Sequence, residues 1–330
     1  MAQRPRRSLL WLVPLLGALL VVPAQAQPKH PKIRAAYSAI SGSMLPAWVA
    51  KEKGLFEKHG LDVELVYVAA GSKLLQALLS GEFAFGVLGG QGVDAAGAGA
   101  DVVYVAGGLD RLVFYLFAKP AIQRVEDLKG KRVGATRINS VSDFAARAAL
   151  KLGGLEPMKD ATILYVGGVP EILAAIIAGS LDAGTISPPT SLQARRAGLR
   201  QLLDLSGTPY VQSALLTTKT YAAREAAATT SFVKAWAEAI SVIHRDKPFT
   251  LKVIGHYTRS QDQEILEETY QSVAPHFKRV PLPPLDVIRL IIQERSQKDE
   301  RAKRLRAEDL VDARFVTRLL ESGFIAELYP

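Results

Sequence analysis

Short apolar runs and amphipathic stretches alternate along the first half of the chain. Between residues 27 and 206, glycine-punctuated apolar runs that suit strands are followed by segments with helical spacing. Beyond Thr229, apolar spacings of three and four residues predict helices over Phe232–Ile243, Ile265–Val273, Leu285–Ile292 and Leu310–Leu320. Strands that alternate with helices are typical of parallel sheets. The pattern therefore predicts an α/β fold with a helical C-terminal region.

The strand–loop–helix order repeats after 98 residues. Ile33–Gly89 aligns without gaps on Lys131–Ser187, and Gly86 then lies over Gly184. The identities are few, but the register is constant, so the repeat predicts two similar lobes. Chance similarity of two strand–helix–strand units is the alternative.

In each predicted lobe, three strands end in short loops of small residues that precede helices. Ligands of parallel sheets bind beyond the carboxyl ends of the strands, where helix N-termini present free N–H groups. A serine at such a position can equally be an ordinary N-cap. The candidate ligand contacts at these loops are Ser41, Ser43, Met44, Gly71, Ser72, Gly90, Gln91, Arg137, Ser140, Ser142, Asp143, Gly168 and Ser187.

Hydroxyl and amide groups dominate this set, and they can donate to a carboxylate or a similar oxyanion. Arg111 and Arg137 are the basic residues nearest the loops, and each could pair with an anion or face solvent. Asp143 could hold a ligand amine, or it could be an ordinary acid in the first turn of a helix. The loops favour a small, anionic organic ligand.

One of these loops resembles a dinucleotide-binding turn. Gly90–Ala95 reads G-x-G-x-x-A, and Asp110 follows twenty residues after Gly90. A dinucleotide turn normally follows the first strand and opens a long helix, whereas this loop is the third and leaves room only for about residues 93–100. We interpret these glycines as packing residues and predict no dinucleotide cofactor.

The first 26 residues have the pattern of a signal peptide. Arg4, Arg6 and Arg7 form a basic start, Leu9–Val22 is an apolar run, and Ala24–Ala26 offers a cleavage site. The run is short for a membrane span, although an uncleaved anchor is the alternative. We expect export to the periplasm with cleavage near Ala26.

Composition adds exclusions. The 330-residue chain has no cysteine, which excludes disulfides, thiolate metal sites and a thiol nucleophile. None of the five histidines has metal-ligand spacing, and no phosphate-binding P-loop or nucleophile–base motif occurs. The net charge is +9, and loss of the three leader arginines lowers it to +6, a mild preference for anions. We therefore expect no metal, no cofactor, no catalytic residue and no nucleic-acid partner.

Four motifs, in order, carry a resemblance to a known family. They are WVAKEKGLF at 48–56, GLDVE at 60–64, LSGEFA at 79–84 and VEDLKGKRVG at 125–134. The sequence resembles the periplasmic substrate-binding proteins of ABC importers, in the nitrate/sulfonate/taurine and NMT1/THI5-like group. Sulfonate binders of that group often carry aromatic-Asp-Pro at the sixth loop, where this chain has Ile186–Pro189. The cysteine motif of its pyrimidine-synthesising enzymes is missing too, so the resemblance implies neither specificity.

The resemblance implies a two-lobed type II periplasmic binding protein fold, each lobe a mostly parallel sheet flanked by helices. Residues 1–26 are then the signal peptide, residues 27–115 and 209–330 lobe 1, and residues 116–208 lobe 2, with hinge strands near 112–119 and 210–218. The implied function is a monomeric receptor that captures a small molecule by hinge closure and delivers it to an ABC permease, its only membrane contact. An enzyme on the same fold, acting on a pyrimidine precursor, and a ligand sensor for a membrane partner are the alternatives.

Overall fold

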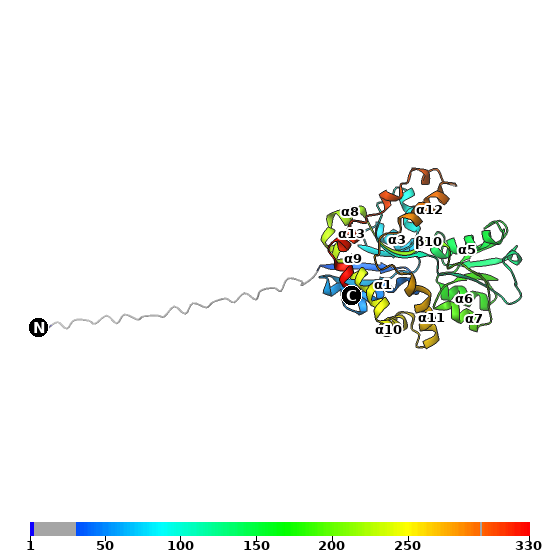
Figure 1. Ribbon diagram of the computed structural model, residues 1–330, viewed down its shortest axis with the longest axis horizontal. Helices are drawn as coiled ribbons and strands as arrows, with labels where there is room; N and C mark the ends of the chain where they lie inside the picture. Colours follow the sequence, from blue (N-terminus) through cyan, green and yellow to red (C-terminus); the bar gives the residue numbers. More distant parts are fainter. Residues whose placement is uncertain (3–30, 298) are drawn as a thin grey trace.

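In a computed structural model, the chain folds around two five-stranded sheets. Figure 1 shows how the helices surround them. The structure describes residues 1–2, 31–297 and 299–330. From residue 3 onward, the predicted signal peptide lies outside the described residues. Within those residues, no helix is both long and apolar enough to cross a membrane.

The first sheet combines four strands from the N-terminal part of the chain with one strand, β10, that comes after the second sheet in the sequence. Its order is β2 (Asp62–Tyr67), β1 (Lys32–Tyr37), β3 (Phe85–Leu88), β10 (Pro209–Thr217) and β4 (Val103–Arg111). β1 pairs in parallel with both β2 and β3, whereas β10 runs antiparallel to β3 and β4.

The second sheet has the same plan and comes from one continuous stretch of chain. Its order is β7 (Thr162–Tyr165), β6 (Arg132–Ala135), β8 (Ala183–Ile186), β5 (Tyr115–Ala118) and β9 (Arg200–Asp204). β6 is parallel to β7 and β8, and β5 is antiparallel to β8 and β9. The predicted α/β class is confirmed, with an antiparallel strand added to each parallel core.

Helices cover both sheets, and those of the second sheet (green) lie to the right in Figure 1. The helices of the first sheet are α1 (Leu45–Glu52), α2 (Leu55–Lys58), α3 (Gly71–Leu79) and α4 (Gln91–Gly97), and the 3-10 turn η1 (Gly42–Met44) precedes α1. Those of the second sheet are α5 (Val141–Leu152), α6 (Val169–Ile177) and α7 (Thr190–Arg196), with the turn η2 (Val125–Leu128). The predicted boundaries of the two lobes stay predictions.

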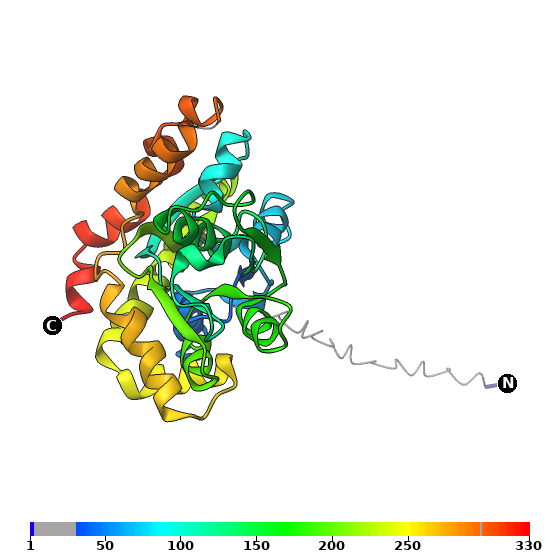
Figure 2. The ribbon, with the colours of Figure 1, turned by 90° about the vertical axis from the view of Figure 1, so that its right-hand side faces the viewer.

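The C-terminal region is helical, and Figure 2 shows it along one side of the molecule in yellow to red. It comprises α8 (Lys219–Arg224), α9 (Ala226–Arg245), α10 (Lys247–Thr258), α11 (Gln263–Val273), α12 (Leu285–Ser296), α13 (Arg314–Glu321), α14 (Phe324–Glu327) and the short turns η3 (Ala274–His276), η4 (Ala302–Arg304) and η5 (Ala307–Leu310). The helix predicted from Leu310 begins only at Arg314. Val311 instead has an extended backbone and forms a β-bridge with Tyr104 at the edge of β4.

The 98-residue repeat is visible in the elements themselves. α3 and α6 begin and end at equivalent residues, and so do β3 and β8. Both helices turn leucine and isoleucine side chains toward their sheet, with Leu74, Leu78, Ile172 and Ile176 almost fully buried. The constant register therefore reflects two lobes built to one plan.

Two short segments cross between the sheets and are hydrogen-bonded to each other. The Leu112 N–H donates to the Thr208 carbonyl over 3.0 Å, and the Leu205 N–H donates to the Phe114 carbonyl over 3.0 Å. The second crossing therefore precedes Pro209, so the hinge predicted at residues 210–218 is wrong in its position. That run is buried along its length because it forms β10, with neighbours on both edges.

An ion-pair cluster joins the lobes beside the cleft, between α7 of the second sheet and α11 of the C-terminal region. Arg195 pairs with Glu268, and Arg196 pairs with Asp262 and Glu264. All of these side chains are partly exposed, so each pair contributes only about 0–1 kcal/mol. Their common effect is to hold the two lobes against each other.

We expect the double variant Arg195→Gln/Arg196→Gln to open the lobes. Loss of pairs that bridge the lobes should move the open–closed equilibrium by about 1 kcal/mol, and added salt should do the same to the wild type. Small-angle X-ray scattering would then give a larger radius of gyration. Arg200→Gln, an exposed arginine of β9, is the matched control. An unchanged radius in the double variant would contradict this role.

Candidate functional site

A cavity of about 200 Å³ lies between the loops that follow the strands of the two sheets. The first sheet contributes Ser38, Ala39, Ile40, Ser41, Ser43, Met44, Tyr67, Ala70, Gly71, Gln91 and Gln212. The second contributes Thr136, Ser140, Val141, Ser142, Gly167, Gly168, Val169, Pro170, Glu171 and Ser187, and Phe114 comes from a crossing segment. Both sheets thus bring the carboxyl ends of their parallel strands to one space, where ligands of such sheets bind.

The structure brings most of the predicted contacts together around this cavity. The lining includes Ser41, Ser43, Met44, Gly71, Gln91, Ser140, Ser142, Gly168 and Ser187. Ser72, Gly90, Arg137 and Asp143 are not among its lining residues. That any of these residues contacts a ligand stays a prediction.

The predicted contacts away from the cavity have other surroundings. Arg137 is exposed, and Ser72 is half-buried in the first turn of α3. A Cβ added at Gly90 would lie 2.5 Å from the Tyr210 hydroxyl, so this glycine serves close packing. Arg111 lies against Asp110, with its Nε 3.5 Å from Oδ1, outside the cavity.

Asp143 is buried and already fully engaged. Its carboxylate pairs with Arg147 over 3.0 Å and accepts hydrogen bonds from the Tyr165 hydroxyl and the Asn139 N–H, each over 3.0 Å. The carboxylate thus holds the loop before α5 in place. This structural role is close to the alternative given above, an ordinary acid in the first turn of a helix.

Ser140 caps α5, and its hydroxyl donates no hydrogen bond to any described residue. Its Oγ accepts from the Asp143 N–H over 3.1 Å and from the Thr136 hydroxyl over 2.8 Å. A serine oxygen accepts twice and donates once. The Ser140 hydroxyl proton therefore has no acceptor among the described residues, and Ser140 lines the cavity.

The Ser142 hydroxyl, by contrast, makes all its hydrogen bonds within the protein. The Thr185 hydroxyl donates to the Ser142 carbonyl over 3.0 Å, so the proton between the two hydroxyls, 2.9 Å apart, must come from Ser142. Its Oγ also accepts from the Thr136 N–H over 3.2 Å. Ser142 thus ties the loop after β6 to β8.

The first lobe offers a hydroxyl and an amide. The Ser43 hydroxyl donates to Ser41 Oγ over 3.3 Å, which leaves the Ser41 proton available. Gln91 Oε1 accepts from the Gly89 N–H over 2.9 Å, so its NH₂ end turns the other way, toward Gly71. A Cβ at Gly71 would lie 2.4 Å from that Nε2 atom. A side chain at position 71 would therefore push the Gln91 amide out of this position.

Two polar atoms of the lining have no hydrogen-bond partner among the described residues. They are Ser187 Oγ, after β8, and Gln212 Oε1, in β10, and both side chains are more than nine-tenths buried. A buried polar atom without a partner costs roughly 1–3 kcal/mol. Such a cost points to a ligand that supplies the partner.

Sequence reasoning missed Gln212 because β10 reads as an apolar strand. The sequence feature that could have indicated Gln212 is its amide side chain, which stands within the mainly apolar run Tyr210–Leu216. Ser38 and Thr136, also missed as contacts, occupy equivalent positions in the 98-residue repeat and both line the cavity.

Glu171 is the one charged residue that lines the cavity among the residues that the structure describes. Its side chain is exposed. Burial, and after it the charge of Glu171, raise the pKa of the Tyr67 hydroxyl. No arginine or lysine belongs to the described lining. An anion here would be held by neutral hydroxyl and amide donors and by helix N-termini.

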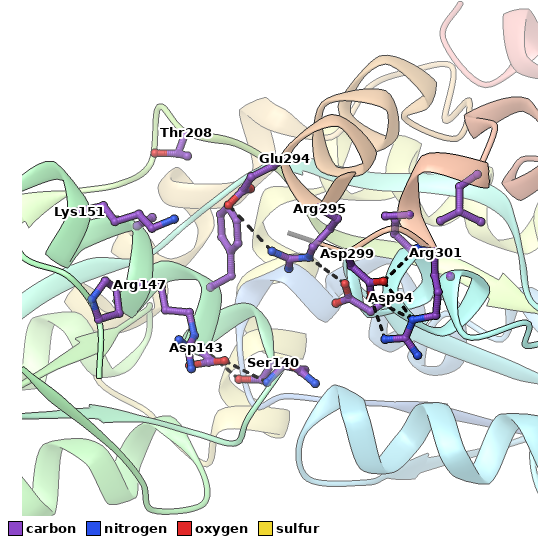
Figure 3. Close-up of a pocket in the computed structure, with 18 of the residues that line it drawn as sticks. Asp94, Ser140, Asp143, Arg147, Lys151, Thr208, Glu294, Arg295, Asp299 and Arg301 are labelled. Carbon is purple, nitrogen blue, oxygen red and sulfur yellow. Dashed lines mark hydrogen bonds and ion pairs between the residues drawn. The ribbon is translucent and has the colours of Figure 1, made fainter. Parts of the chain in front are cut away.

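A larger cavity, of about 770 Å³, opens on the other side of Ser140, between α5 and the α4–α12 region (Figure 3). Some of its charges are paired: Arg295 with Asp94 over 2.8 Å, and Arg301 with Asp299 over 2.7 Å. Arg295 also lies over the Phe144 ring, which stacks on Tyr210 at 3.8 Å. The two Phe144 contacts join the lobes. The smaller cavity, whose lining holds Ser187 and Gln212 with unpartnered polar atoms, is the better candidate for a ligand site.

Comparison with known proteins gives one family match. The family model described as "NMT1/THI5 like" matches residues 42–247. A "Putative binding protein" of Brucella abortus (strain 2308) is 29% identical over 175 residues, which are 52% of this chain and 53% of that protein. A protein of the same description from Brucella suis biovar 1 (strain 1330) matches equally. The chain thus spans about half the length of the curated relatives it matches.

Solved structures show the same fold at low identity. The alkanesulfonate-binding protein SsuA of Xanthomonas axonopodis pv. citri, bound to MOPS, superposes with a TM-score of 0.73 at 22% identity and covers 86% of this chain and 99% of its own. The periplasmic nitrate-binding protein NrtA of Synechocystis PCC 6803 gives a TM-score of 0.75 at 14% identity, covering 92% of this chain and 91% of its own. The predicted two-lobed binding-protein fold is confirmed.

We expect Gly71→Ala to destabilise the protein by about 1–3 kcal/mol, because the added methyl group overpacks against the Gln91 amide. Urea unfolding would measure the loss. Ser72→Ala, one residue further on, should change stability by less than about 0.5 kcal/mol. Gly71→Ala/Gln91→Ala should recover part of the loss, because removal of the amide removes the clash. Additive losses in the double variant would contradict this contact.

Proposed function

The chain belongs to the NMT1/THI5-like family, and from that premise we propose that it is a periplasmic receptor that binds a small organic molecule and delivers it to an ABC importer. Its solved structural relatives include periplasmic binding proteins for alkanesulfonates and nitrate. The one observation that carries the proposal is the convergence of uncommitted hydrogen-bonding groups from both lobes on a single cavity.

The proposed mechanism is capture by closure, without covalent chemistry. The two hydrogen-bonded crossing segments act as the hinge, and the lobes close on the ligand from opposite sides. A ligand that contacts both lobes stabilises the closed form by its differential affinity for that form. The permease would then recognise the closed conformation of the receptor rather than the ligand itself.

The ligand class that we propose is a small molecule with an oxyanion, such as a carboxylate. Ser41 from the first lobe, and Ser140 and Ser187 from the second, each have a hydroxyl proton that no described group accepts. These neutral donors, with the Gln91 amide and the helix N-termini, suit one negative charge without a cationic side chain. Glu171 at the opening disfavours a second negative charge.

The experiment that tests this function is native mass spectrometry of the protein purified from its own periplasm. Recovery of one intact small molecule, which raises the unfolding midpoint when it is added back, would support a receptor. A protein that carries no ligand and consumes a candidate compound would instead be an enzyme on this fold. Unimpaired uptake of the recovered molecule in a deletion strain would favour the ligand sensor.

We expect Ser41→Ala and Ser140→Ala each to weaken binding of the recovered molecule by roughly 10- to 100-fold, the usual effect of losing a hydrogen bond to a charged group. Ser140→Ala should also lower stability by about 1 kcal/mol, because it removes the cap of α5, whereas Ser41→Ala should not. Calorimetric titration and urea unfolding would separate the two effects. Ser80→Ala, an exposed serine at the end of α3, is the control. Unchanged affinity in both variants would refute this placement of the oxyanion.

A further inference from the structure

The first turn of α5 lies between the two cavities that separate the lobes. Val141, at the start of that helix, lines the smaller cavity, Phe144 lines the larger one, and Ser140 (Figure 3) lines both. The first lobe repeats this arrangement in α4, where Gln91 lines the smaller cavity and Val93 the larger one. The beginnings of α4 and α5 therefore stand at the boundary between spaces of about 200 Å³ and about 770 Å³.

Two contacts close this boundary, each between a side chain of α5 and the first lobe. Val141 packs on the backbone of Gly89, because a Cβ added to that glycine would lie 2.6 Å from Val141 Cγ2. The Phe144 ring stacks on the Tyr210 ring, with the two centroids 3.8 Å apart. Residues three apart lie on the same side of a helix, so the two contacts form one wall across the cleft.

The Gly89 side of this wall is held in place by the first lobe. The Gly89 N–H donates to Gln91 Oε1 over 2.9 Å, and the Gly89 carbonyl accepts from the Tyr104 hydroxyl over 2.8 Å. The β10 backbone lies behind it, because the same added Cβ would be 2.5 Å from the Val211 carbonyl oxygen. The part of the wall that a substitution can remove is therefore the isopropyl group of Val141.

The larger cavity offers apolar surface beyond the wall. The apolar residues of its lining include Val93, Ala148, Leu152, Ala302 and Leu305. Each methylene group that is buried against such surface improves affinity roughly fourfold. A ligand chain that reached this space would therefore bind more tightly, whereas a chain that meets a closed wall overpacks the smaller cavity and binds less tightly.

We propose that Val141 sets the length limit of the ligand by separating the binding cavity from the larger cavity. The inference rests on the receptor function and on the placement of the carboxylate proposed above. A monocarboxylate held by the serine hydroxyls can extend only as far as the contact between Val141 and Gly89. Short members of a series then bind and longer members clash, so the wall selects by size without contacting the charged group.

The test compares Val141→Ala with the wild type on straight-chain monocarboxylates from acetate to decanoate, each titrated calorimetrically into the mature protein. We expect the affinity of the wild type to fall beyond a short chain length. In Val141→Ala, that limit should move by about two or more carbons, and the first chain that the wild type rejects should bind about tenfold more tightly or better. Val141 is half-buried and begins a helix, where alanine is favoured, so this variant should fold.

Val169→Ala is the matched control. Val169 also begins a helix and also lines the smaller cavity, but its helix α6 contributes no residue to the described lining of the larger cavity. Its truncation enlarges the smaller cavity without opening the wall, so the limit should move by at most about one carbon. Val141→Thr keeps the branched shape of the side chain and should keep the limit of the wild type. Urea unfolding checks that each variant is folded.

Four results would overturn the inference. The first three are an unchanged limit in Val141→Ala, an equal shift in Val169→Ala, and a shifted limit in Val141→Thr. The fourth, no binding of any probe up to about 10 mM by the wild type and Val141→Ala, would remove the carboxylate placement on which the wall acts. In each case, an intact molecule recovered from the periplasmic protein would keep the receptor function. Recovery of none, with a compound consumed, would remove both.

Discussion

Parallel strands place their carboxyl ends at one edge of a sheet, and here two such edges face each other across one cavity. Everything functional in the molecule depends on that opposition. Each lobe contributes only half of a hydrogen-bonding set, and neither half encloses a ligand alone. The hinge segments and the contacts of α7 with α11 and of Phe144 with Tyr210 matter because they decide how the halves meet.

Inside the cavity, the protein's own hydrogen bonds decide which residues are available. Ser140 and Ser142 are two residues apart, yet they differ in what they can donate. The Ser140 hydroxyl proton has no acceptor in the described protein, whereas Ser142 donates its hydroxyl proton to Thr185. The carboxylate of Asp143, the next residue, pairs with Arg147 and accepts a hydrogen bond from Tyr165. The charge of Asp143 is thus neutralised within the second lobe, and apart from Glu171 the described lining is uncharged. Such a site discriminates by the direction of hydrogen bonds more than by attraction between charges.

Local patterns were enough to predict the loops, because a strand, a small polar turn and a helix are each determined by neighbouring residues. The loop positions and the α/β fold follow from them, and so do the residues placed at the cavity. What the sequence could not supply depends on distant partners. Gln212 becomes part of the site only because β10 returns beside β3, and α13 starts late only because Val311 meets Tyr104. Gly71 lines the cavity while Ser72 does not, since successive helix residues face different directions.

The position of β10 also sets an order of assembly. The second sheet is made from residues 115–204 without interruption, so all its strands are present as soon as that stretch of chain is available. The first sheet cannot join β3 to β4 until residues 209–217 arrive, because β10 lies between those strands. Contacts between residues so far apart in the chain form slowly. In a chain that emerges from its N-terminus, all strands of the second sheet are therefore available before the first sheet can be completed, and the binding cavity cannot form until residues 209–217 have joined that sheet.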